Sequence, residues 1–263
     1  MPLIIKDEYP EVLFREDGKR LDGREKNELR PIKMEVGVVK NADGSAYLEW
    51  GNNKIFAAVY GPREVHPHHL AKPDQGVLRV FYRMATFSVF DRKRPAPGRR
   101  EKEISMIISD CLEPLLFLEL YPGTSFEVFI EVIDADGGTR CASTTVAALA
   151  LADAGIPMKS LVSAVAVGKI DGKIVVDLSG IEDKAGEADL PCAITWYNKE
   201  ISLLQFDGDM DLNEMNDFFN LAKEALEKIH QIQLDTLKSK FLTIQEKSDE
   251  IIINKEKQGE SQK

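Results

Sequence analysis

Short runs of alternating apolar and polar residues occupy the first patterned region of the chain. Between residues 31 and 60 the segments IKMEVGVV, AYLEW and NKIFAAVYG are separated by Asn-Ala-Asp-Gly and Gly-Asn-Asn, which are turn sequences. This pattern predicts an antiparallel meander. Residues 77–82 are a further strand candidate, and residues 125–134 place Phe, Val and Ile at alternate positions, which predicts another strand.

The apolar spacing becomes helical after the first strands. Isoleucine, cysteine and leucine recur at helical intervals, which predicts an amphipathic helix from Arg99 to about Leu120 that Pro114 kinks or splits. Small residues between 141 and 154 predict a second helix that can approach a sheet closely. Asp211 is a candidate N-cap for a last helix that ends at about residue 240.

The second half of the chain contains further strand candidates. They cover residues 162–170, 173–178, 188–197 and 200–206, and the Asp-Gly between the first two predicts a hairpin. The resulting order is strands, helix, strand, helix, strands, helix. This order predicts an α+β fold with largely antiparallel pairing rather than an alternating doubly wound sheet.

Length and composition indicate one large domain or two fused lobes in a chain of 263 residues. The longest apolar stretches, such as residues 146–152, are far shorter than the ~20 residues that span a bilayer. The N-terminus has acidic residues early and no apolar signal segment, so we expect a cytoplasmic protein without membrane contact. We expect an N-terminal extension over residues 1–19 and a polar, disordered tail over 245–263.

The cysteines and the net charge limit the classes of site. Cys111, Cys141 and Cys192 are too widely separated for a paired disulfide framework or a zinc site, so we interpret them as reduced core residues. The formal net charge of −10 is unlike that of proteins with a basic surface throughout. Any contact with nucleic acid must therefore be local.

The segment DADGGTR at residues 134–140 lies between a predicted strand and a predicted helix. A glycine pair lets the backbone approach an anion, the helix N-terminus presents N–H groups, and Thr139 and Arg140 add a hydroxyl and a guanidinium. Together these features predict a phosphate cradle. An ordinary turn with a helix cap is the alternative interpretation.

The acidic segment EDKAGEAD at residues 182–189 carries four carboxylates between apolar stretches. Such crowding raises some pKa values, and it can hold a divalent metal or keep one acid protonated. Asp183 and Asp189 are predicted to lie near the ends of buried strands. A solvated acidic loop is the alternative.

Two basic segments are candidate anion contacts. Residues 92–102 hold six basic side chains, and Arg99 and Arg100 begin a helix, where cations oppose the macrodipole. Arg63 and three histidines follow a strand, and a surface contact with RNA explains them better than a metal site does. A solvated loop is the alternative for both segments.

These segments, in this order, resemble the RNase PH family, and within it the catalytic RNase-PH-like subunit of the archaeal exosome. The residues GKRLDGR at 18–24 and ELRPI at 28–32 are similar to the N-terminal pattern of the family, and residues 134–140 and 182–191 to its phosphate and acidic motifs. The resemblance covers residues 20 to about 240. It implies an RNase PH-like (ribosomal protein S5 domain 2-like) fold of two similar βαβα-type lobes with mixed, largely antiparallel sheets. We place the domain at residues 20–244 and the lobes at about 20–155 and 156–244.

The resemblance also implies roles. The attacking inorganic phosphate would be held by Gly138, Thr139, Arg140 and Arg100. RNA would be contacted by Arg63, His68, Arg99 and Arg100. Catalysis would depend on Asp183 and Asp189, as acid or as ligands to Mg²⁺. His68 stands where relatives often carry arginine. The implied activity is phosphorolysis of single-stranded RNA 3′ ends to nucleoside diphosphates. The implied partners are a homologous inactive subunit, in a hexameric ring that is a trimer of heterodimers, and RNA-binding cap subunits.

Three other functions compete with this interpretation. The first is a homohexameric RNase PH that trims transfer RNA 3′ ends, and the second is a catalytically silent ring subunit that binds RNA. The third is an unrelated metal-binding protein that uses residues 182–189. Retention of the arginines and of Asp183 argues against the silent subunit.

Overall fold

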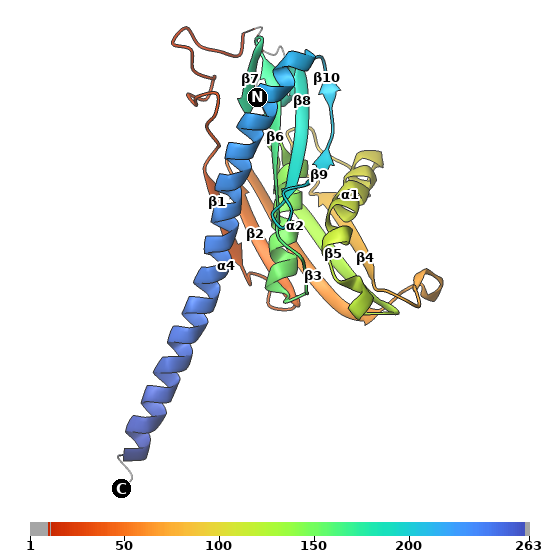
Figure 1. The fold of residues 1–263 in the computed structure, drawn as a ribbon, viewed down its shortest axis with the longest axis vertical. Helices are drawn as coiled ribbons and strands as arrows, with labels where there is room; N and C mark the ends of the chain where they lie inside the picture. The colour runs from red at the N-terminus through yellow and green to blue at the C-terminus, as the bar shows by residue number, and fades with distance from the viewer. Residues whose placement is uncertain (1–9, 11, 261–263) are drawn as a thin grey trace.

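The computed structural model describes residue 10 and residues 12–260, and it contains two sheets (Figure 1). The first sheet has the order β1-β2-β3-β5-β4. All neighbours in it are antiparallel except β4 and β5, which are parallel, so the predicted meander is confirmed for β1 to β3. The strands are β1 (Ile32–Val36), β2 (Gly44–Trp50), β3 (Asn53–Glu64), β4 (Val77–Met84) and β5 (Thr124–Asp134).

The second sheet is antiparallel throughout and comes from the second half of the chain. Its order is β10-β8-β6-β7, and β9 pairs with β8. Asp171 and Gly172 have φ values of 47° and 69° in the turn between β6 and β7, which confirms the predicted Asp-Gly hairpin. The strands are β6 (Val162–Ile170), β7 (Lys173–Val176), β8 (Ala188–Thr195), β9 (Ile201–Leu204) and β10 (Asp207–Gly208).

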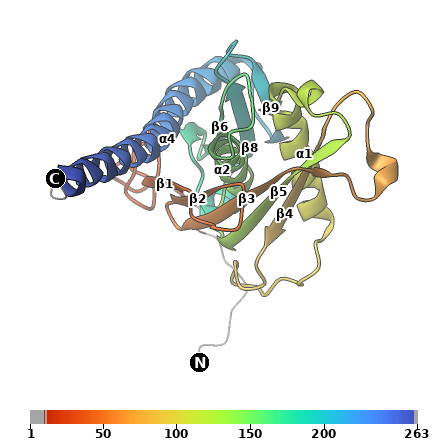
Figure 2. The ribbon, with the colours of Figure 1, turned by 90° about the horizontal axis from the view of Figure 1, so that it is seen from below.

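Helix α2 (Thr139–Asp153) lies between the two sheets and contacts strands of both (Figures 1 and 2). Alanine, serine and threonine make up much of it, and most of its residues are buried. The close approach is visible at Gly44, where an added Cβ would lie 2.2 Å from the backbone nitrogen of Ala154. Small side chains therefore allow one helix to pack against both sheets.

Two more helices flank the sheets. Helix α1 (Arg99–Leu112) packs against β4, and α4 (Met215–Glu260) packs against β6 and β1 before it continues away from the body of the molecule (Figure 1). In the part of the chain that the structure describes, no helix combines the length and the apolar character needed to cross a bilayer. The three cysteines are buried and free, which confirms their interpretation as core residues.

Several boundaries differ from those predicted. Helix α1 ends at Leu112 instead of Leu120, because Pro114 lacks an N–H donor and 3-10 turns replace the helix after it. Helix α4 extends beyond Lys240 to Glu260, so the prediction of a disordered tail from residue 245 is wrong as far as Glu260. Within α4 the sequence has no proline, and the first glycine of the helix is Gly259. Residues 261–263 lie outside the described residues.

The first part of the acidic segment lies in a short helix, α3 (Gly180–Ala185), which the sequence interpretation missed, and its last two residues begin β8. Ser179 caps it, and Glu182 returns the bond to the Ser179 backbone in a capping box. Of the predicted N-terminal extension, residues 1–9 and 11 lie outside the described residues. The described part of this extension packs on the second lobe, because Leu13 is buried there and its N–H donates to Asp171 at 2.7 Å.

Candidate active site

The turn from β5 to α2 brings the N-terminus of α2 to a cavity. Gly137 and Gly138 both have left-handed backbone conformations, with φ values of 69° and 65°. A side chain on Gly137 would come within 2.7 Å of the Ser179 backbone, so the turn also depends on the absence of a Cβ. Since α2 has 15 residues, its unpaired N–H groups and macrodipole favour an anion at this end.

Thr139 and Arg140 add donors to this helix end. The Thr139 hydroxyl accepts a hydrogen bond from Tyr82 at 3.1 Å, which leaves its own hydrogen directed away from Tyr82. Burial raises the pKa of Tyr82 to about 12, so Tyr82 stays a donor at neutral pH. Nε of Arg140 is buried and has no hydrogen-bond partner among the described residues. A bound anion would satisfy this nitrogen, which is costly to leave unpaired.

The cavity at this helix end has a volume of about 400 Å³. Its walls come from the β5–α2 turn, from α3, from the start of β8 and from α1, and they include Gly138, Thr139, Arg140, Arg100, Asp183 and Asp189. A second cavity of about 760 Å³ shares Arg100, Arg140, Asp183 and Asp189 with the first and adds Arg99. The structure thus brings all the predicted catalytic and phosphate-binding residues together.

Asp183 and Asp189 form an acidic pair that lines the same cavity as Arg100 and Arg140. Burial, and next the negative charge of Asp183, raise the pKa of Asp189 to about 7. Oδ1 of Asp189 is also buried without a hydrogen-bond partner in the described structure. At neutral pH the pair therefore shares a proton for part of the time, which is the state that a general acid requires.

The other carboxylates of the acidic segment have different positions. Glu182 is buried and pairs with Arg20, whereas Glu187 accepts a bond from the Gly172 N–H at 2.7 Å and lies 3.6 Å from Lys169. Of the four carboxylates in this segment, only Asp183 and Asp189 line the 400 Å³ cavity. This segment is therefore not a uniformly solvated acidic loop.

Asp183 and Asp189 offer few ligands for a metal. No group of three or more His, Cys, Asp and Glu residues in the described part of the chain could hold a metal ion. Two carboxylates nevertheless suit Mg²⁺, which keeps several waters and uses substrate phosphate oxygens as further ligands. The unpaired, buried Oδ1 of Asp189 fits such a role.

The arginines at the start of α1 are placed by Glu101. This carboxylate accepts bonds from the Gly98 N–H at 2.9 Å and from Lys93 at 3.1 Å, and it therefore caps the helix. Burial alone would raise the pKa of Glu101, but the bonds from Lys93 and from backbone N–H groups lower it. Glu101 thus offsets the unfavourable arginines at this helix end, and Arg99 and Arg100 remain exposed.

Arg63 and His68 lie at the opposite end of the first sheet. Arg63 pairs with Ser125 in the register of β3 and β5, while Lys54 pairs with Asp134 near the glycine turn. The nine-residue offset along β5 corresponds to about 30 Å. Arg63 stacks over Tyr60, His68 lies 3.6 Å from Glu64, and both are exposed. Neither lines the cavity, and their contact with RNA stays a prediction.

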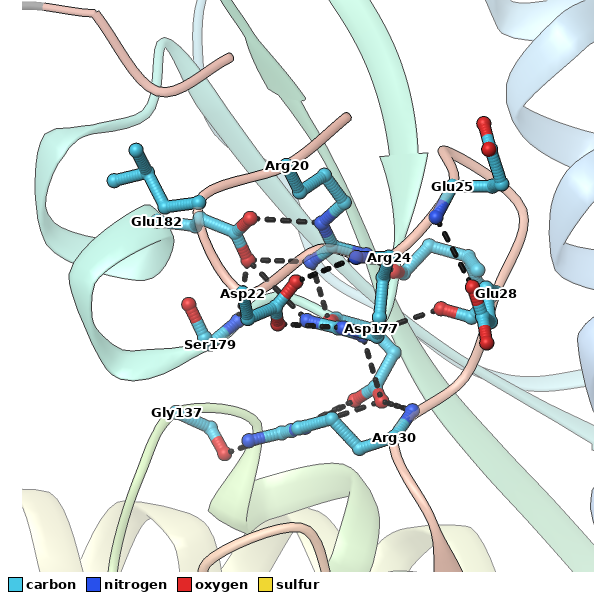
Figure 3. A network of polar contacts seen from close by, with 12 residues as sticks. Arg20, Asp22, Arg24, Glu25, Glu28, Arg30, Gly137, Asp177, Ser179 and Glu182 are labelled. Carbon is cyan, nitrogen blue, oxygen red and sulfur yellow. Dashed lines mark hydrogen bonds and ion pairs between the residues drawn. The ribbon is translucent and has the colours of Figure 1, made fainter. Parts of the chain in front are cut away.

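A buried network of ionic contacts lies behind the cavity (Figure 3). Arg20 is fully buried and donates from Nε to Glu182 at 2.7 Å, and also to the backbone oxygens of Val176 and Asp177 at 2.7 and 2.8 Å. Arg24 donates to Asp177 O at 2.9 Å. These bonds attach the N-terminal segment to residues 176–177 and, through Glu182, to α3. Glu182 directly precedes Asp183.

Arg30 and Asp177 connect this network to the glycine turn. Asp177 accepts bonds from the Arg30 backbone N–H and from its Nη2, both at 2.7 Å, and from Trp50 at 2.9 Å. Arg30 also donates to the carbonyl oxygens of Asp136 and Gly137. Burial would raise the pKa of Asp177, but the charge and the hydrogen bonds of Arg30 lower it. The network thus connects the glycine turn and α3.

The sequence interpretation did not assign roles to Arg20, Arg30 or Asp177. A single sequence does not show that an arginine is buried, because most arginines are exposed. The available signal was the spacing of the arginines within residues 18–32, which was recognised only as part of a family pattern.

Comparison with known proteins gives one consistent result. Two family models match, described as domain 1 of a 3′ exoribonuclease family, RNase PH, at residues 28–157 and domain 2 at residues 160–225. The chain is 58% identical over 232 residues to the exosome complex component Rrp41 of Thermococcus kodakarensis, covering 88% of this chain and 93% of that one. It is 53% identical over 235 residues to Rrp41 of Methanopyrus kandleri, covering 89% and 98%.

Two solved structures share the fold. Rice (Oryza sativa) Rrp46 has a TM-score of 0.75 at 24% identity, over 83% of this chain and all of the rice chain. A chain of the Archaeoglobus fulgidus exosome with RNA bound to the active site has a TM-score of 0.72 at 21% identity, over 82% of this chain and 92% of that one. At these identities the likeness concerns the fold alone, and it confirms the predicted α+β architecture.

Proposed function

The chain belongs to the RNase PH family of 3′ exoribonucleases, and from this membership we propose that it degrades RNA by phosphorolysis as the catalytic subunit of an archaeal-type exosome. One observation carries the chemical part of the proposal. The end of α2, with Thr139 and Arg140, lines a single cavity of about 400 Å³ together with the Asp183–Asp189 pair and Arg100. Anion-binding groups and an acidic pair in one cavity suit a reaction between phosphate and a phosphodiester.

Inorganic phosphate binds first at the end of α2 in this mechanism. The Thr139 hydroxyl and the backbone N–H groups after Gly138 donate to its oxygens, and the unpaired Nε of Arg140 gains a partner. A phosphate oxygen then attacks the last phosphodiester of the RNA. Arg100 and Arg140 stabilise the charge on the equatorial oxygens, and the fixed donors reduce the cost of alignment.

The acidic pair serves the leaving group. The bond from phosphorus to the 3′-oxygen of the shortened RNA breaks, and that oxygen takes the proton that Asp183 and Asp189 share. The products are a nucleoside diphosphate and an RNA one nucleotide shorter. Bound Mg²⁺, held by both aspartates, would supply charge stabilisation at the same oxygen. Because phosphate rather than water accepts the nucleotidyl group, the enzyme is a nucleotidyltransferase and not a hydrolase.

The arginines outside the cavity extend the RNA site. Arg99 lines the adjoining 760 Å³ cavity, and Arg63 lies about 30 Å away along β5. Arginine contacts to phosphates carry little sequence information, so we expect weak sequence preference and an affinity that falls with salt. His68 would contribute only when it is protonated.

The assembly is proposed from the relatives. They are named exosome complex components, and this chain covers more than 90% of the length of several of them. We propose a hexameric ring in which this chain alternates with a homologous inactive subunit, RNA-binding cap subunits on that ring, and a cytoplasmic location. The rival assembly is a homohexamer that trims transfer RNA, which size-exclusion chromatography of the chain alone would reveal.

Decay of a single-stranded RNA tests the proposal. The full chain, alone and mixed with its ring partner, is assayed with and without inorganic phosphate, and the released mononucleotide is identified. Nucleoside diphosphate that forms only with phosphate is the expected result. RNA binding without product in the assembled ring would instead support the silent subunit.

A further inference from the structure

The cavity has an apolar rim beside its phosphate cradle. Met84, Val89 and Phe90 line the same cavity as Thr139 and Asp183. The Phe90 side chain is 81% exposed, which is unusual for a large aromatic residue at the edge of a polar cavity. Phe87, three residues earlier, is 69% exposed but does not line the cavity.

The loop that carries Phe90 is held at both ends. At one end, Ser88 accepts a bond from the Ala135 N–H at 2.9 Å and donates its own N–H to Ala85 at 3.0 Å. At the other end, Lys93 donates its N–H to Thr86 at 3.0 Å and its side chain to Glu101 at 3.1 Å. Since Ala135 lies two residues before Gly137, these bonds set the position of Phe90 relative to the cradle.

The charges around Phe90 indicate the kind of ligand. Asp91 follows it directly, and three cations, Arg92, Lys93 and Arg94, come next in the loop. Lys93 and Arg100 line the same cavity as Phe90. An exposed aromatic ring among cations is the combination that binds single-stranded nucleic acid, because the cations contact phosphates and the ring stacks on a base. Every base has a π-face, so such stacking tolerates any sequence.

We propose that Phe90 stacks on the base of the 3′-terminal nucleotide of the RNA. The terminal nucleotide is favoured over the others because it carries the phosphate that reacts at Thr139 and Asp183, in the cavity that Phe90 lines. This inference rests on the proposed exoribonuclease function. Stacking would hold the nucleotide that leaves as the diphosphate and would not take part in the bond changes.

Binding in phosphate-free buffer tests the inference, because no cleavage occurs there. The wild type, F90A, F90Y and the matched control F87A are each assembled in the form that is active with phosphate. Each is titrated with one oligoribonucleotide, with the same RNA lacking only its 3′-terminal base, and with the same RNA lacking only its penultimate base. We expect the wild-type Kd to rise about tenfold on loss of the base, and the Kd of F90A for the intact RNA to rise by a similar factor.

The combination of the two changes decides the result. F90A should show little further loss with the abasic RNA, because both changes remove the same contact. F90Y should restore binding, and F87A should behave as the wild type. The inference would be wrong if removal of the 3′-terminal base weakened binding to F90A as much as it weakens binding to the wild type. It would also be wrong if F90A were insensitive to removal of the penultimate base instead of the 3′-terminal base. Absence of diphosphate from wild type with intact RNA and phosphate would instead refute the proposed function.

Discussion

Helix α3 separates two regions that use the same residue types in different ways. On one side, Glu182 is buried with Arg20 and belongs to the network behind the cavity. On the other side, the next residue, Asp183, lines the cavity with Arg100 and Arg140. Arginines in the network form ion pairs with Asp and Glu, and even Nη2 of Arg24, which makes no hydrogen bond, lies 3.6 Å from Glu182. Nε of Arg140, by contrast, is buried and has neither a hydrogen bond nor an ion pair among the described residues. The comparison teaches that paired charges here hold shape, while incompletely paired charges are available for substrate.

Replacement of Asp183 tests the cavity side and should have the largest effect. In D183N the shared proton is no longer available to the leaving oxygen, so kcat should fall about 10²–10⁴-fold. The free energy of unfolding, measured by urea denaturation, should not fall, because D183N removes the negative charge that raises the pKa of Asp189. Degradation of RNA at the wild-type rate by folded, assembled D183N would contradict the assignment of Asp183.

Replacement of Arg20 tests the network side. R20A leaves Glu182 buried without its main partner, and loss of one partner of a buried ion pair costs about 3–5 kcal/mol. Urea denaturation of R20A against the wild type measures this loss. The double variant R20M/E182L removes both charges and should recover part of this loss, because the bonds from Arg20 to two backbone oxygens and from the Ser179 N–H to Glu182 stay absent. If R20A unfolded at the wild-type urea concentration, the network would not have the structural role described here.

Acid should destabilise the protein more through the buried network than through exposed ion pairs. The partners of Asp177 and Glu182 overcome the effect of burial and lower both pKa values below those of ordinary Asp and Glu. Their stabilisation is therefore present above about pH 4 and is lost as pH falls through the lowered values. Unfolding free energies measured from pH 7 to pH 3 should fall more steeply for the wild type than for R20M/E182L. Equal slopes would contradict the assigned ionisation.

Replacement of Arg99 should have a smaller effect, confined to RNA. R99A removes an exposed cation from the second cavity, so affinity should fall several-fold and the slope of log K against log salt should decrease by about one. Stability should not change. Filter binding at several salt concentrations measures the slope, and an unchanged slope would show that Arg99 does not contact a phosphate.

Glu187 provides the smallest expected effect within the same acidic segment. Its side chain is exposed and its ion pair with Lys169 has a separation of 3.6 Å, so E187Q should change stability by less than about 0.5 kcal/mol. Activity should remain at the wild-type level, as measured by RNA decay. A large loss of activity in E187Q would mean that the carboxylates needed for activity in the acidic segment are not limited to Asp183 and Asp189.

The sequence predicted the outline of the fold because its strands and helices have clear periodicities. The meander, the Asp-Gly hairpin and the glycine turn before α2 all follow from local residue types. The prediction failed where local signals were weak. Helix α3 was missed because it has only six residues, and the end of α1 was placed beyond Pro114 although the helix ends at Leu112. Helix α4 was ended too early because polar composition was interpreted as disorder, although Lys, Glu and Gln also favour helix.

The candidate site was predictable in part for the same reason. The glycine turn and the aspartates have recognisable local sequences, and the structure places them in one cavity. The partners of the network are separated by 147 to 162 residues, as for Arg30 with Asp177 and Arg20 with Glu182, and no local pattern reports such pairing. Periodicity likewise does not show that an exposed residue such as Phe90 lies on a cavity rim.

The attachment of the N-terminal segment to residues near 180 affects the order of events during synthesis. Arg20 and Arg30 leave the ribosome early, but Asp177 and Glu182 are made roughly 150 residues later, a delay of roughly 8 to 30 s at ordinary translation rates. Until then the first arginines lack their partners and the glycine turn lacks its support. A nascent chain that stops after the first lobe therefore carries the phosphate-binding residues without a completed nuclease site.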